Sequence, residues 1–124
     1  MPFVDAARAL VRRLPPNDKT RVVLEYLLHH GAGRGNAQPW GNIEQYLNTR
    51  GIDMSQTHFQ QTILADTRSG DIFIGSNDHG AGRGYFLIQD RADADLAREF
   101  YTRRIAAQEA NLNRLDELIR QQWP

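Results

Sequence analysis

The chain has 124 residues, which is enough for one domain with a buried core. Its 15 basic and 15 acidic residues cancel, it contains no cysteine, and 40% of its residues are apolar. This composition excludes disulfides, thiolate zinc sites and wholesale disorder, and it argues against a protein that coats nucleic acid through net charge alone. We find no apolar run near the ~18 residues of a membrane span and no basic start of a secretion signal, so we expect a cytoplasmic protein with no membrane partner.

Four helices are predicted in the first half of the chain. The helical spacing of apolar residues, with Pro, Gly and capping residues at the ends, places them at 2–14, 18–30, 42–50 and 55–66. Asn42 is expected to cap the third helix, and either Asp53 or Ser55 the fourth. The segment between Gly31 and Gly41 is predicted to be a loop that Trp40 plugs into the core.

The next block changes to the pattern of a β-hairpin. Strands are predicted at 71–75 and 85–88, because apolar and aromatic residues cluster there on either side of a turn rich in Gly, Asn and Asp. The predicted class is therefore mainly α with a small β-hairpin (α+β).

A long helix is predicted from Asp93 to Trp123, where no Gly or Pro interrupts the chain. Its apolar residues follow a heptad pattern, which indicates either packing on the first helix or pairing with a second copy across a two-fold axis. We favour a homodimer. The expected dimerisation residues are Ile105, Leu112, Leu115, Ile119 and Trp123. The neighbouring Arg103 and Arg104 are either a solvated face or a phosphate contact.

Three helices followed by a hairpin are the element order of a winged helix-turn-helix. Residues 18–88 resemble the winged-helix superfamily, and small phage-encoded or prophage-encoded members in particular, because Gly84-Tyr85-Phe86 ends the hairpin and a long helix of coiled-coil type follows. The resemblance implies a DNA-binding or regulatory role. It also divides the chain into an N-terminal helix (1–17), a winged-helix domain (18–88) and a dimerisation helix (89–124).

By this resemblance, residues 55–66 form the recognition helix that lies in the DNA major groove. Gln can bond adenine at two points, and Thr can contact a thymine methyl group. The alternative is an ordinary solvated polar face. The expected DNA-binding residues on and just after this helix are Ser55, Gln56, Thr57, His58, Gln60, Gln61 and Arg68.

A hexapeptide occurs twice, as residues 30–35 and again as residues 79–84. Each copy places one arginine, Arg34 or Arg83, between glycines, where backbone N–H groups and a guanidinium can together bind a phosphate oxygen. We add both arginines to the expected DNA-binding residues. The alternative is that both copies are loops selected for flexibility, and neither fits a nucleotide-binding P-loop.

The remaining polar residues form no pattern of a catalytic or metal site. His29 and His30 are adjacent and cannot act as ligands on one helix face, while His58 and His79 are isolated. We therefore predict no metal, no cofactor and no enzyme. The leading hypothesis is a homodimeric, sequence-specific regulator that binds double-stranded DNA. The alternative is a winged helix that binds another protein, such as a phage-encoded inhibitor or adaptor, and does not bind DNA.

Overall fold

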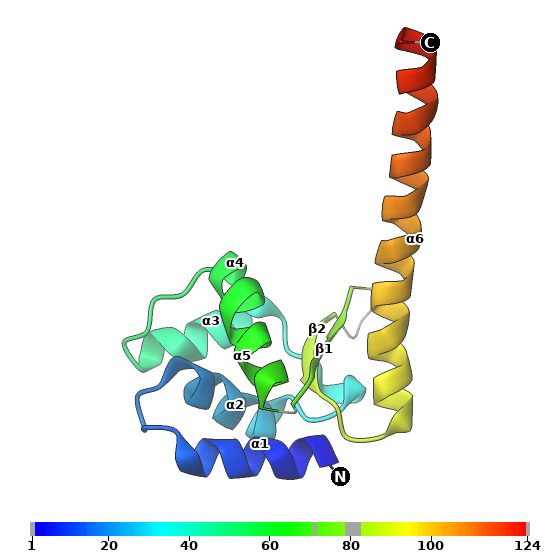
Figure 1. Ribbon diagram of the computed structural model, residues 1–124. Coiled ribbons are helices and arrows are strands. Elements are labelled where there is room, and N and C mark those ends of the chain that lie inside the picture. The colour runs from blue at the N-terminus through cyan, green and yellow to red at the C-terminus, as the bar shows by residue number, and fades with distance from the viewer. Residues whose placement is uncertain (1, 71, 79–82, 124) are drawn as a thin grey trace.

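The computed structural model describes residues 2–70, 72–78 and 83–123. It is mainly helical, with one two-stranded antiparallel hairpin, which confirms the predicted α+β class. Figure 1 shows the shorter helices gathered on one side of the hairpin and a single long helix on its other side.

The first three helices build most of the core. They are α1 (Pro2–Arg13), α2 (Lys19–His30) and α3 (Trp40–Thr49). The sequence leaves Asn17 and Asp18 as alternative caps of α2, and Asp18 is the cap, since its side chain accepts a hydrogen bond from the Arg21 backbone N. The most buried side of α2 faces both neighbours, and its buried residues are Thr20, Val22, Val23, Leu24 and Leu27.

The start of α3 differs from the prediction. The helix begins at Trp40 rather than after Asn42, because the Asn42 backbone N donates to the Pro39 carbonyl and closes the first turn two residues earlier. Trp40 is thus the first residue of the helix rather than a loop residue, but it packs against the core as predicted. Its ring is half-buried against Phe59, with the two ring centres 5.0 Å apart.

The fourth predicted helix is one continuous helical segment with three parts. These are α4 (Gln56–His58), a π-helical turn η2 (Phe59–Ile63) and α5 (Leu64–Ser69). Ser55 caps the segment, since its hydroxyl accepts from the His58 backbone N. The segment passes the predicted end at Asp66 and stops at Gly70, whose backbone N donates to Thr67 O.

The hairpin pairs β1 (Ile74–Asn77) with β2 (Gly84–Leu87). The first strand begins three residues later than predicted. Ile72, which the prediction placed within that strand, instead donates its backbone N to Thr67 O and so is held at the C-terminal end of α5. The predicted starting residue, Asp71, lies outside the described residues.

The loop after α2 lies against the free edge of β2. Gly33 N donates to Leu87 O and Gln38 N to Tyr85 O, while β2 donates back through Leu87 N to Gly31 O and Tyr85 N to Gln38 O. A short helical turn, η1 (Arg34–Asn36), lies within this loop. The loop therefore fixes the hairpin beside α2 and α3.

The long helix α6 runs from Arg91 to Gln122, two residues earlier at its start than predicted. Its first third packs on the hairpin, and its buried residues are Asp93, Ala97 and Phe100. From Arg104 to Trp123 every residue is exposed. In Figure 1 this second part rises clear of all other elements and carries the C-terminus to its far end.

Candidate nucleic-acid interface

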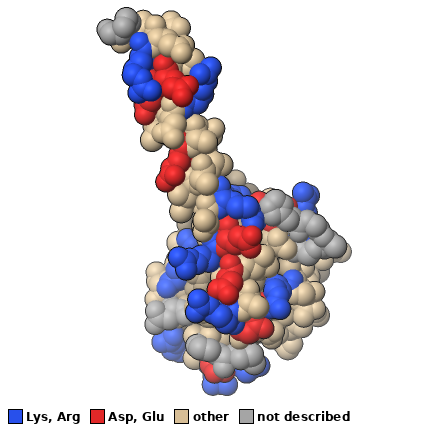
Figure 2. All heavy atoms as spheres, turned by 90° about the vertical axis from the view of Figure 1, so that its right-hand side faces the viewer, with Lys and Arg blue, Asp and Glu red and all other residues tan. Residues whose placement is uncertain are grey.

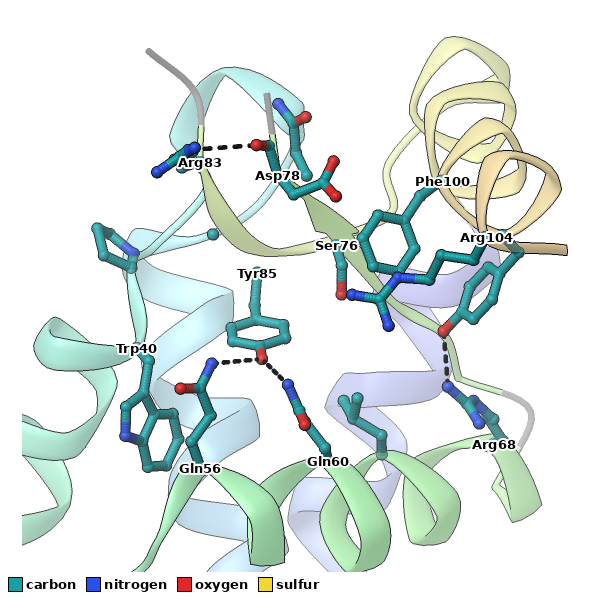
Figure 3. A pocket seen from close by; sticks show the side chains of 15 residues that line it. Trp40, Gln56, Gln60, Arg68, Ser76, Asp78, Arg83, Tyr85, Phe100 and Arg104 are labelled. Atoms are coloured by element: carbon teal, nitrogen blue, oxygen red, sulfur yellow. Dashed lines mark hydrogen bonds between the residues drawn. The ribbon is translucent and has the colours of Figure 1, made fainter. Parts of the chain in front are cut away.

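A groove of about 590 Å³ lies between the α4–η2–α5 segment, the hairpin and α6. Figure 3 looks into it, with the α4–η2–α5 segment along one side, α6 along another and Tyr85 at its base. Aromatic rings and arginines dominate its lining. The lining residues used below are Trp40, Gln56, Gln60, Arg68, Asp78, Arg83, Tyr85, Phe100, Tyr101 and Arg104.

Two of the predicted readout residues are held by the hairpin. The Gln56 and Gln60 side-chain amides both donate to the Tyr85 hydroxyl, at 3.1 and 2.9 Å. Tyr85 is nearly buried and packs edge-on against Phe59, so its position is fixed. The two glutamines therefore connect the helix to β2 and line the groove, although both remain exposed.

Two arginines stand on the α6 side of the groove with their guanidinium groups oriented by aromatic rings. Arg68 donates to the Tyr101 hydroxyl at 2.8 Å and lies 4.9 Å from the centre of the Phe73 ring. Arg104 lies 4.3 Å from the centre of the Phe100 ring. Within the part of the chain that the structure describes, neither arginine forms an ion pair with a carboxylate. Stacking on a ring orients a guanidinium without neutralising its charge.

The third arginine of the groove comes from the hairpin. Arg83 Nε donates to the Asp78 backbone O at 3.2 Å, and Figure 3 shows this contact at the rim opposite the helical segment. Asp78 is the one carboxylate among the described lining residues, and it accepts from Arg103 on α6 at 3.2 Å. Three arginines and one aspartate give the groove a local positive charge in a chain of zero net charge.

The other predicted arginine, Arg34, has a different environment. Its Nη1 forms ion pairs with Asp93 at 2.8 Å and Asp90 at 3.1 Å, and its backbone N also donates to Asp93 at 3.0 Å. The first copy of the hexapeptide thus attaches the loop after α2 to the start of α6. In the second copy, residues 79–82 lie outside the described residues, and the two copies have different partners where both are described.

Asp93 is the most enclosed carboxylate of this contact, with its side chain 1% exposed. Burial alone would raise its pKa, but hydrogen bonds from the Gln89 backbone N, the Arg34 guanidinium and the Arg34 backbone N together outweigh burial and lower the pKa. The carboxylates of Asp93 and Asp90 in turn raise the pKa of Arg34. The pair is therefore charged at neutral pH, and Arg34 is already satisfied by acidic partners.

The remaining predicted residues lie on the α4–η2–α5 segment outside these contacts. Thr57 and Gln61 are exposed, and His58 is half-buried. Ser55 is a helix cap, as described above. The structure thus places Gln56, Gln60, Arg68 and Arg83 around one groove and Arg34 in a separate contact.

Sequence reasoning missed Trp40 and Tyr101 as groove residues and left Arg104 undecided. The sequence analysis assigned Trp40 to the core. The spacing of apolar residues along the long helix does not distinguish Tyr101 from other half-buried positions. The signal for Arg104 was present, because it lies one turn beyond Phe100, the last buried residue of α6.

The described residues hold no group of three or more His, Asp or Glu side chains placed to bind a metal ion. Within the same residues, no helix combines the length and the apolar character that crossing a membrane requires. No family model matches this chain, and neither curated proteins nor solved structures include a match to it.

Proposed function

We propose that the protein is a DNA-binding protein of winged-helix type that acts as a homodimer, and that it is not an enzyme. The observation that carries the proposal is the pair Arg68 and Arg104. Both border the groove beside the α4–η2–α5 segment, and both carry a charge that no described carboxylate neutralises. Guanidinium groups in this state are suited to bind phosphate oxygens.

The arrangement of elements supports the same proposal. The hairpin lies next to the polar helix, and Tyr85 and the two glutamines hold the pair together. If a duplex lay on this face, the sugar-phosphate backbone of one strand would follow the groove and contact Arg68, Arg83 and Arg104. Base edges would then face Thr57 and Gln61, which are both exposed.

This proposal assigns different tasks to the predicted residues. Gln56 and Gln60 fix the groove, since each already donates to Tyr85. Arg34 positions α6 and is not used for DNA. Direct base contact is left to Thr57, through a thymine methyl group, and to Gln61, whose bidentate contact with adenine is worth about 1–3 kcal/mol of discrimination.

The second candidate is a winged-helix protein that binds another protein. The observation that favours it is the zero net charge together with the exposed apolar side chains of α6. A protein partner seated in the groove would not show a strong dependence on salt, whereas DNA binding releases counterions and falls with salt.

The test is retention of duplex DNA from the protein's own genomic neighbourhood over a series of salt concentrations. Each lost phosphate contact lowers the slope of log affinity against log salt by about 0.9. We expect this change for Arg68→Ala and for Arg104→Ala. Arg12→Ala is the matched control, because Arg12 is exposed on α1, away from the groove. Equal slopes in all three variants, or no retention by the unmodified protein, would refute the proposal.

A further inference from the structure

The projecting half of α6 carries the largest exposed apolar surface of the described residues. Its six large apolar side chains are between 37% and 76% exposed, and they are Ile105, Leu112, Leu115, Leu118, Ile119 and Trp123. Figure 2, seen from the α6 side, shows uncharged atoms along much of this shaft between separate charged groups. A monomer would leave this surface in water at a free-energy cost.

The apolar residues share one side of the helix. With Ile105, Leu112 and Ile119 at position a of a heptad, Leu115 falls at position d. A shallow apolar hollow of about 320 Å³ follows the same side. Its lining residues are Tyr101, Arg104, Ile105, Gln108, Glu109 and Leu112. A side chain from a second helix could insert there, as knobs enter holes in a coiled coil.

Two of the d positions are polar, and they distinguish the possible directions of pairing. In a parallel pair in register, Gln108 and Gln122 each meet their own copy and can bond amide to amide. In an antiparallel pair centred on Leu112 and Leu115, they would face the isoleucines at 119 and 105. A buried amide against an isoleucine lacks a hydrogen-bond partner, so the antiparallel pair is penalised.

The charges beside the seam favour the same direction. In a parallel pair, Glu109 and Asp116 at positions e lie beside positions g of the second copy, none of which is acidic. In the antiparallel pair, Glu109 would instead lie next to Asp116 of the second copy, which gives a repulsion on each side. Opposite charges at e and g are the usual determinant of orientation.

The seam also has a defined beginning. The heptad core position that precedes Ile105 is position d, which Tyr101 occupies. Tyr101 packs on Phe73 and Arg68 of its own copy. One step earlier is Arg98, which is exposed and would meet its own copy with like charge. Pairing therefore begins at Ile105, where the packing of α6 on the domain ends.

We infer that residues 105–122 of two copies form a parallel, in-register, two-stranded coiled coil. This inference rests on the homodimer of the proposed function but not on DNA binding. It places both domains at the same end of the coiled coil. The partner is a second copy of this chain, because the matched glutamine layers arise, and the repulsion between acids is avoided, when the chain meets itself in register.

Disulfide trapping tests the direction of pairing, because the chain contains no cysteine of its own. Gln108→Cys and Gln122→Cys are each oxidised in a glutathione buffer and separated on a non-reducing gel. We expect each variant to form covalent dimers by itself. Ala110→Cys is the matched control, since Ala110 is exposed on the side of α6 opposite the seam and should remain monomeric on the gel.

Three results would overturn the inference. A cross-link that forms only when Gln108→Cys is mixed with Ile119→Cys would mean antiparallel pairing. Equal cross-linking of Ala110→Cys would mean unspecific contact, and no cross-linking of any variant would mean that another molecule or none covers this face. Retention of DNA in the salt series is measured separately, so either proposal can fail while the other stands.

Discussion

At the scale of single residues, Asp93 joins three parts of the molecule. It accepts hydrogen bonds from the loop after α2 and from Gln89, and it lies in the first turn of α6. Removing it leaves the Arg34 and Gln89 backbone N–H groups without an acceptor. We expect Asp93→Ala to lower the free energy of unfolding by about 2–4 kcal/mol in urea denaturation.

Asp95→Ala is the control for this prediction. Asp95 lies two residues further along α6, is exposed, and pairs with Arg91 on the helix surface. Its loss should change the free energy of unfolding by less than about 0.5 kcal/mol. Similar losses in both variants would contradict the role given to Asp93.

The same carboxylate predicts how stability depends on pH. Because the folded pKa of Asp93 lies below its ordinary value of 3.8, the folded state binds fewer protons than the unfolded state as pH falls. Its contribution is complete above pH 3.8 and is lost below that value. We expect the difference in unfolding free energy between the unmodified protein and Asp93→Asn to be constant above this pH and to shrink below it. A difference that stays constant in acid would contradict the assignment.

At the scale of elements, the hairpin is fixed by a close approach between β2 and the loop after α2. Gly84 begins β2 with a φ of +133°, and a Cβ there would meet the Gln38 backbone. We expect Gly84→Ala to destabilise the protein by more than about 1 kcal/mol in thermal or urea unfolding.

Gly41→Ala is the matched control for this substitution. Gly41 lies in the first turn of α3, and nothing is within 4 Å of a Cβ built there. This change should be neutral or raise stability by up to about 1 kcal/mol, because alanine loses less conformational entropy than glycine in a helix. Equal destabilisation by both changes would show that the close approach at Gly84 is unimportant.

Most element boundaries could be predicted because local signals define them. Asp18 and Ser55 cap their helices through contacts within the chain segment concerned, whereas the end at Gly70 lies beyond the predicted end at Asp66. The start of β1 could not be predicted, because Ile72 has strand character and yet bonds to Thr67. Likewise, no local pattern indicates that Gln56 and Gln60 meet Tyr85, since 25 or more residues separate these partners in the chain.

The tasks of the two glycine-rich copies differ for a similar reason. Their sequences are identical, but Arg34 of the first copy lies beside the start of α6, where it pairs with Asp90 and Asp93, whereas Arg83 in the described part of the second copy donates to the Asp78 backbone O. Identity of sequence therefore does not imply identity of function when the surrounding elements differ.

At the scale of the whole molecule, we expect the exposed part of α6, residues 104–123, to determine the oligomeric state and to add little to the stability of a single copy. Replacing Leu112 and Ile119 by glutamate should give a monomer in analytical ultracentrifugation. Thermal stability of the domain should change little, because both side chains are exposed in a single copy.

Ala110→Glu is the control for charge, since it adds an acid on the opposite side of α6. It should remain a dimer over a dilution series. If the unmodified protein is already monomeric at micromolar concentration, the role given to α6 is wrong.

We propose that duplex DNA binds in the groove beside the α4–η2–α5 segment. Trp40 lines that groove. In a Trp123→Phe variant, Trp40 is the one remaining tryptophan and reports on the groove through its fluorescence. We predict a saturable change in emission when duplex DNA is added, reversal by salt, and loss of the change when Arg68 and Arg104 are replaced by alanine. An emission that does not respond to DNA, or a response that survives both replacements, would contradict the account.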